Sequence, residues 1–320
     1  MKRFISIAVS IIILSIIYSK IDLQGLADIF LNSDRFWMPV SLAMVIPITL
    51  FTAWRLQQLM PKSTYLGFAE ANRLILAASV LNMVLPSKMG DIAKAYFMRE
   101  RGHLSGSLSL SLVVFEKSCD LLSLLLWCVF GLLLYPQKDL LFWTMTLGVT
   151  IGLLVGLSIL GSRKFADLFF RIIRKVAPNK IKEKVKKLQI SWAQMHNYFW
   201  SDKRQLVKIS ATSIFIWFLH LLQIWFFILA LNAWAPFMSS LALSPLAILA
   251  GLLPLTFAGV GTRDAALVIF YEPYFDATVA AGLGLLCTAR YFLPAIGGLP
   301  FLGQYLTTIK TMKQSDISEY

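Results

Sequence analysis

Two short stretches of the sequence place a turn and charged residues inside otherwise apolar segments. LPSKMGDIAKAYF occupies residues 85–97, and LPLTFAGVGTRDAALVIF occupies residues 253–270. In each stretch, a proline ends the preceding helix and a glycine permits a tight turn. A helix that restarts after the turn directs its free N–H groups and its positive dipole end into that turn. Both stretches therefore predict anion-binding sites.

The charged residues of the two stretches suit a phosphate-bearing ligand. In the first, Lys88 stands beside the start of the new helix, and Asp91 can cap it. In the second, Arg263 offers a planar fork that fits phosphate, while Thr262 or Asp264 can cap the helix. The predicted headgroup-binding residues are Lys88, Gly90, Asp91, Lys94, Gly259, Gly261, Thr262, Arg263 and Asp264. A structural alternative is that the glycines only allow close helix packing and that Arg263 and Asp264 form a plain ion pair.

Two acidic residues, Glu116 and Asp120, lie inside another apolar segment. They are four residues apart in sequence, so they share one face of a helix. Charges inside a membrane segment are costly and usually face a cavity or one another. We expect these carboxylates either to line a cavity or to be the counter-charges of Lys88, Lys94 or Arg99.

A basic residue, Arg290, lies inside the last apolar segment and has no carboxylate within helical reach. It is expected to face a cavity, with Asp264 or a lipid phosphate as its partner. Arg73, on the segment that leads into the first turn, is a further candidate for a cavity. The predicted cavity-facing charges are Arg73, Glu116, Asp120 and Arg290.

The composition indicates which kind of protein carries these residues. Of 320 residues, 58% are hydrophobic and only 15% are charged, and long apolar runs recur along the chain. This pattern is typical of a polytopic α-helical membrane protein, whereas a membrane barrel would show alternating residues. The predicted spans are Phe4–Tyr18, Phe36–Trp54, Ser109–Tyr135, Leu140–Leu160, Leu206–Leu231 and Thr278–Leu306. No soluble catalytic domain remains once these spans are assigned, so we do not expect an enzyme.

The distribution of basic residues predicts the orientation of the spans. Cytoplasmic loops are enriched in lysine and arginine, so Lys2 and Arg3 place the N-terminus in the cytoplasm. Residues 163–208 carry 13 basic and 3 acidic residues and should also be cytoplasmic. They would be external if Tyr65–Leu85 were a full span, so this run is predicted to enter the membrane and return on the same side. Phe237–Leu255 is predicted to do the same from outside, which leaves the C-terminus in the cytoplasm.

These assignments predict an all-α polytopic membrane fold, with about six spans and two opposed re-entrant helical hairpins in a single domain, residues 1–320. Residues 1–135 and residues 136–320 would form an inverted-topology repeat, each with three spans and one hairpin. Within the second repeat, residues 162–205 would form a basic amphipathic segment on the anionic cytoplasmic leaflet.

Other functional classes have little support in the sequence. Three cysteines form no CxxC pair, and three scattered histidines argue against a metal site, so no metal or other cofactor is expected. The net charge of +13 fits membrane orientation, so nucleic-acid binding is not expected either.

At its two turn motifs the chain resembles the flippase-like transmembrane domain of bacterial lysylphosphatidylglycerol synthases, and the likeness extends over essentially all of its length. The residues that match the first motif are Pro86, Gly90, Asp91 and Lys94, and those that match the second are Pro254, Gly259, Gly261, Arg263 and Asp264. The chain departs from the family where serine and an extra glycine often stand, at Thr256, Phe257 and Ala258. The acid of the second motif is commonly glutamate, and here it is aspartate.

The resemblance implies lipid translocation in a bacterial plasma membrane. It does not imply lysine transfer, because no aminoacyl-transferring domain is found in these residues. Relatives are linked to different lipids, so the resemblance does not fix the substrate. The main expectation is a lipid flippase or transporter that binds an anionic phospholipid or polyprenyl-phosphate headgroup between the two hairpins. The alternatives are a membrane subunit or enzyme of polyprenyl-linked glycolipid synthesis, or a structural partner of such a lipid-modifying enzyme.

Overall fold

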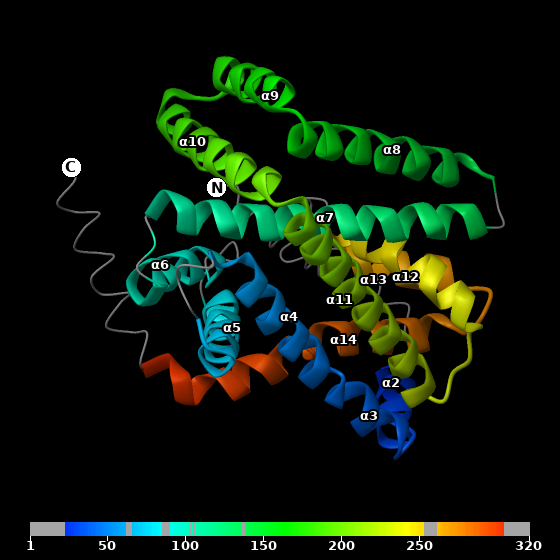
Figure 1. Cartoon of the computed structure of the whole chain (residues 1–320). Helices are drawn as coiled ribbons and strands as arrows, with labels where there is room; N and C mark the ends of the chain where they lie inside the picture. Colours follow the sequence, from blue (N-terminus) through cyan, green and yellow to red (C-terminus); the bar gives the residue numbers. More distant parts are fainter. Residues whose placement is uncertain are drawn as a thin grey trace. The chain divides into compact units, whose positions relative to one another are not determined.

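The computed structural model describes residues 23–61, 66–84, 90–102, 104, 106–135, 138–252 and 261–303. Its helices are α2 (Leu23–Leu31), α3 (Trp37–Ala43), α4 (Val45–Leu59), α5 (Phe68–Val84), α6 (Gly90–Gly102), α7 (Gly106–Leu134), α8 (Leu140–Gly161), α9 (Arg163–Val176), α10 (Asn179–Ser201), α11 (Lys203–Ala230), α12 (Phe237–Leu252), α13 (Thr262–Tyr271) and α14 (Ala277–Ala289). Residues 292–303 are also helical. No strand occurs among the described residues, so the predicted all-α fold is confirmed (Figure 1).

Long apolar helices identify the chain as a multi-pass membrane protein. Five of them are long and apolar enough to cross a membrane: Trp37–Leu59, Leu108–Leu134, Leu140–Gly161, Lys203–Ala230 and Ala277–Gly303. They correspond to five of the six predicted spans, with ends that differ by a few residues. The remaining predicted span, Phe4–Tyr18, lies outside the described residues.

Four other helices are, over their described residues, shorter than the candidate spans, and they form two packed pairs. At 1.5 Å per residue, α5 and α6 are about 25 Å and 20 Å long, and α12 and α13 are about 24 Å and 15 Å long, against roughly 30 Å of hydrocarbon. α5 packs against α6, and α12 packs against α13. These pairs coincide with the two predicted hairpins, whose partial entry into the membrane stays a prediction.

The return of α6 onto α5 depends on a glycine. Gly90 is the first residue of α6, and it is buried. A Cβ atom at this position would lie 2.4 Å from the carbonyl oxygen of Ala78 and 2.7 Å from the backbone nitrogen of Asn82, both on α5. Because no side chain fits in this space, Gly90 allows the two backbones to approach directly.

The chain divides into two compact units. The first unit comprises Met1–Ile48, Leu124–Ile151 and Trp217–Leu293, and the second comprises Thr49–Ser123, Gly152–Ile216 and Pro294–Tyr320. Each unit contains one pair of short helices, α12–α13 in the first and α5–α6 in the second. The units draw on both predicted sequence repeats, and the repeat itself stays a prediction.

Close helix contacts hold the first unit together. A Cβ atom at Gly131 on α7 would lie 2.2 Å from the carbonyl oxygen of Ala242, so α7 and α12 touch backbone to backbone. The buried Tyr271 hydroxyl joins α13 to α12 through the hydroxyls of Ser240, at 3.1 Å, and Ser244, at 2.8 Å. These contacts fix α13 beside α12.

The core of the second unit combines apolar packing with buried polar contacts. Phe115 of α7 stacks on Phe199 of α10 at 3.9 Å between ring centroids. The Ser111 hydroxyl donates to the carbonyl oxygen of Ser191, 2.5 Å away, and again joins α7 to α10. These two contacts hold α7 against α10.

Candidate functional site

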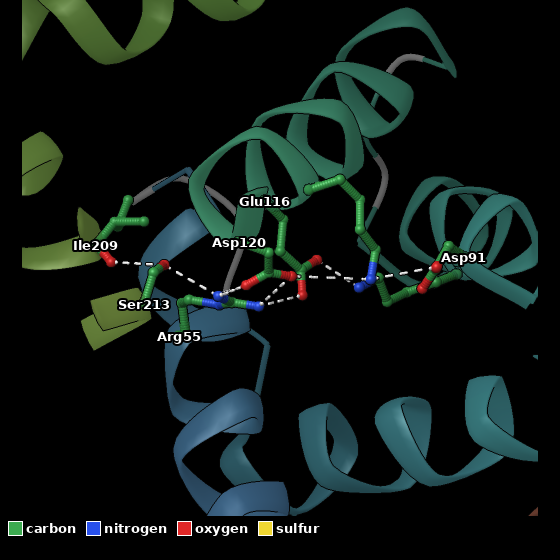
Figure 2. Close-up of polar contacts among 8 residues, drawn as sticks. Arg55, Asp91, Glu116, Asp120, Ile209 and Ser213 are labelled. Atoms are coloured by element: carbon green, nitrogen blue, oxygen red, sulfur yellow. Dashed lines mark hydrogen bonds and ion pairs between the residues drawn. The ribbon is translucent and has the colours of Figure 1, made fainter. Parts of the chain in front are cut away.

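A buried carboxylate, Glu116 of α7, is the centre of an ion-pair network in the second unit (Figure 2). One oxygen, Oε1, accepts from Arg55 of α4 at 2.9 Å, and the other, Oε2, pairs with the ammonium of Lys94 of α6. All three side chains are only 2% exposed. Arg55 and Lys94 are 61 and 22 residues away from Glu116 in sequence, so the network ties three separate helices together.

Further charges extend the network toward the surface. Asp120, one turn after Glu116, pairs with Arg55, and Arg55 also donates to the Ser213 hydroxyl of α11 at 3.0 Å. Lys117 lies 3.2 Å from Asp91 of α6 and 3.9 Å from Asp120. The side chain of Lys117 is 48% exposed, so this end of the network reaches solvent or headgroups.

Among the described residues, the network is balanced in charge. It joins three cations, Arg55, Lys94 and Lys117, to three carboxylates, those of Asp91, Glu116 and Asp120. Since both oxygens of Glu116 are occupied by cations, Lys94 is committed to an internal partner in this structure. Because each cation already has a carboxylate partner, the network fixes the helices and leaves no unpaired positive charge for an added anion.

In the first unit, the start of α13 is organised by a glycine and an aspartate. Gly261 precedes α13 with φ at 103°, a left-handed conformation that side-chain-bearing residues rarely adopt. The Asp264 carboxylate accepts the Gly261 N–H at 3.0 Å through Oδ2. This contact closes the first turn of the helix, as a helix cap does.

Arg263 has three partners, and two of them link α13 to α14. Its guanidinium donates to Asp264 at 2.6 Å, to the Thr288 hydroxyl at 2.7 Å and to the carbonyl oxygen of Gly284 at 2.8 Å. Two glycines leave room for this arrangement. A Cβ atom at Gly251 would lie 2.8 Å from the Cβ of Arg263, and one at Gly284 would lie 2.7 Å from Asp264 Oδ1. Arg263 and Asp264 are thus an ion pair with a structural function, whatever else they bind.

Arg290 interrupts a membrane-spanning helix at its middle. It follows α14 as a turn residue, and the helix resumes at residue 292. In the 27-residue span Ala277–Gly303, residue 290 is central by position. A charged residue at such a depth is costly, and interrupted helices of transporters commonly line binding sites.

The Arg290 guanidinium is buried and largely without partners. The residue is 5% exposed, and among the described residues neither Nε nor NH1 has a hydrogen-bond partner. The remaining nitrogen, NH2, lies 3.3 Å from the Tyr291 hydroxyl, and the guanidinium lies 5.2 Å from the Tyr291 ring centroid. The negative dipole end of α14 offsets part of the charge, but it supplies no counter-ion.

The two units therefore differ in their electrostatics. The second unit balances its buried cations with carboxylates, as described above. In the first unit, Arg263 is paired with Asp264 and Arg290 has no ion-pair partner within the described part of the chain. Arg263 donates to Thr288 of α14, so it is held by contacts within the first unit. One uncompensated positive charge remains, and an anion would neutralise it.

The structure brings together some of the predicted site residues. Asp91, Lys94, Glu116 and Asp120 share the network, and Gly261, Arg263 and Asp264 share the start of α13. Thr262 begins α13. Arg73 is exposed, with its guanidinium 5.7 Å from the Phe301 ring centroid. Lys88 and Gly259 lie outside the described residues, so their predicted roles stay predictions.

Four residues of these two sites were missed by the sequence analysis: Arg55, Ser213, Gly284 and Thr288. Arg55 lies four residues before the end of the span Trp37–Leu59, whereas the sequence prediction ended this span at Trp54. A charged residue inside an apolar helix would have been a signal for it. The other three are small residues in helices, and nothing in their spacing distinguishes them from packing residues.

Comparison with known proteins places the chain in a family. No curated protein matches it in a sequence search. The family described as the lysylphosphatidylglycerol synthase TM region matches residues 3–298, which is nearly the whole sequence. The protein is therefore an integral membrane protein that belongs to the lysylphosphatidylglycerol synthase TM region family.

Proposed function

We propose that this protein is a flippase-like lipid transporter of the bacterial plasma membrane, and that Arg290 binds the phosphate of an anionic lipid. The observation that supports the proposal best is the buried Arg290 guanidinium, whose Nε and NH1 have no described partner. A phosphate group presents several acceptor oxygens that match the planar fork of an arginine. A phosphate would thus supply both the missing acceptors and the missing negative charge.

The surroundings of Arg290 suit a ligand that arrives from the lipid phase. Tyr291, the next residue, is 51% exposed, so the interruption of the helix reaches the surface of the protein. An anionic headgroup could therefore enter sideways while its acyl chains stay in the bilayer. The transport part of the proposal is supported by the resemblance of the chain to the flippase-like domain, and the family match supports its place in a membrane.

Replacing Arg290 with glutamine tests this assignment, because the variant is expected to be at least as stable as the wild type without lipid but to bind lipid more weakly. In the absence of lipid, the apparent Tm of the detergent-solubilised protein should stay the same or rise, since an uncompensated buried charge is removed. With short-chain phosphatidylglycerol added, the wild-type Tm should rise with lipid concentration. The variant should need lipid concentrations on the order of 10- to 100-fold higher for the same rise, because it loses hydrogen bonds to a charged group.

Two controls complete the experiment. Arg35→Gln removes the same charge from an exposed position of the first unit and should bind lipid as the wild type does. Short-chain phosphatidylcholine, whose headgroup is zwitterionic, should raise the wild-type Tm much less than phosphatidylglycerol. A large loss of stability in lipid-free Arg290→Gln, or an unchanged response to phosphatidylglycerol, would contradict the proposal.

A further inference from the structure

α9 has three distinct faces, although it contains only 14 residues. One face is buried in the second unit, where Phe170 packs on Trp192 of α10 with 6.3 Å between ring centroids. A second face is apolar and exposed, and its residues, with exposed fractions of 38–82%, are Phe165, Leu168, Ile172 and Val176. At 3.6 residues per turn these four positions form one continuous stripe along the helix.

The third face of α9 is basic. Its residues are Arg163, Lys164, Arg171, Arg174 and Lys175. Of these, Arg163, Lys164, Arg171 and Lys175 are exposed, and by helical periodicity the last three flank the apolar stripe. The single acidic residue of the helix, Asp167, accepts a hydrogen bond from Gln189 of α10 at 2.9 Å. With five basic residues and one acidic residue, α9 therefore carries a net positive charge.

The start of α9 is fixed at the end of a membrane span. Only Ser162 separates α9 from α8, which ends at Gly161, and the Ser162 hydroxyl caps α9 by accepting the Phe165 N–H. The Trp200 indole N–H donates to the carbonyl oxygen of Leu160, 2.9 Å away, which ties the end of α10 to the same place. The α9–α10 pair, adjacent in Figure 1, thus has one end of each helix beside the last turn of the candidate span α8.

We propose that α9 lies in the surface of an anionic lipid leaflet. The apolar stripe would enter the boundary between headgroups and acyl chains, and the flanking basic side chains would bind the negatively charged headgroups. Three features favour lipid over a protein partner: the exposed apolar stripe, the basic edge and the attachment of α9 to the end of a span. A protein partner would have to reach the level of the lipid headgroups to cover the stripe. This surface shares no residue with the Arg290 site, so a negative result for one proposal would not contradict the other.

Labelling of the full-length protein in vesicles tests this proposal. The native cysteines, Cys119, Cys128 and Cys287, are buried, so a fluorophore can be directed to an introduced cysteine. We would label Ile172→Cys, on the apolar stripe, and Arg163→Cys, an exposed position on the opposite side of the helix, with an environment-sensitive dye. In vesicles of equal parts phosphatidylglycerol and phosphatidylcholine, the label at position 172 should shift to shorter emission wavelengths and be quenched by spin-labelled lipid. The label at position 163 should be quenched by iodide in the water instead.

A variant that lacks the exposed basic edge separates the electrostatic part of the lipid interaction from the apolar part. In Lys164→Gln/Arg171→Gln/Lys175→Gln, the difference in lipid quenching at position 172 between phosphatidylglycerol-containing and pure phosphatidylcholine vesicles should be lost. Iodide quenching at position 172 of the wild-type background, or equal lipid quenching in both vesicle types, would overturn the proposal. A signal that changes with the protein-to-lipid ratio would overturn it too, because a second copy of the chain would then cover the stripe.

Discussion

Replacing Glu116 with glutamine is expected to lower the free energy of unfolding by about 3–5 kcal/mol, the range for a broken buried ion pair. The substitution keeps the shape of the side chain and removes its charge. Lys94 and Arg55, each 2% exposed, would then lose the carboxylate that they share, and water could not replace it. The measurement is the apparent Tm of the purified protein in detergent, which should fall strongly relative to the wild type.

Two further variants show whether charge is the cause. Lys117→Gln acts at the exposed end of the same network and should change stability by at most about 1 kcal/mol, as exposed ion pairs do. Adding Lys94→Met to Glu116→Gln removes one of the stranded cations and should recover part of the lost stability. If Glu116→Gln were as stable as the wild type, the network would not hold α4, α6 and α7 together as described.

Replacing Arg263 with glutamine is the second change for which a large loss is expected, again of about 3–5 kcal/mol. It would leave the Asp264 carboxylate, which lies in a buried residue, without its cation, and would remove the contacts to Thr288 and to the Gly284 carbonyl oxygen. Arg263→Lys should also be destabilising, because an ammonium cannot reproduce the planar fork that reaches three partners. Thermal unfolding measures both effects.

A double-mutant cycle provides the control for Arg263. The variant Arg263→Gln/Asp264→Asn has no stranded charge, and its asparagine can still accept the Gly261 N–H through its side-chain oxygen. It should therefore be more stable than Arg263→Gln alone. A double variant no more stable than the single one would show that Arg263 acts through its helix contacts and not through its charge.

Removal of the two buried arginines should thus have different effects on stability. Arg263 is 6% exposed and has three described partners, whereas Arg290 is 5% exposed and lacks partners for two nitrogens. Removal of the first should destabilise the protein, and removal of the second should not. A residue that is costly to the folded state and is nevertheless present is expected to serve binding.

The sequence predicted the membrane spans well because their signal is local. A run of apolar residues long enough to cross a bilayer is visible without any knowledge of the fold, and five of the six predicted spans were confirmed. Arg290 was expected to have Asp264 or a lipid phosphate as its partner, and in the structure Asp264 pairs with Arg263. The lipid phosphate stays a prediction.

The ion-pair network could be predicted only in part. The pairing of Glu116 with Lys94 was one of several open choices, because helical periodicity shows that charges share a face but not which helix faces them. Arg55, 61 residues away in sequence, could be identified as the other partner only from the tertiary structure. For Arg263, the adjacent Asp264 could be predicted as a partner from the sequence. Thr288 of α14 could not, because it is 25 residues away.

The most direct test of the central claim is the exchange of lipid between the two leaflets of a vesicle. Purified protein would be reconstituted with fluorescent phosphatidylglycerol, with and without an ion gradient, and exchange would be followed by chemical quenching of the outer leaflet. We expect faster exchange than in empty vesicles for the wild type and for Arg35→Gln, and exchange near the empty-vesicle rate for Arg290→Gln. Exchange equal to that of empty vesicles for the wild type under every condition, or wild-type exchange by Arg290→Gln, would contradict the account.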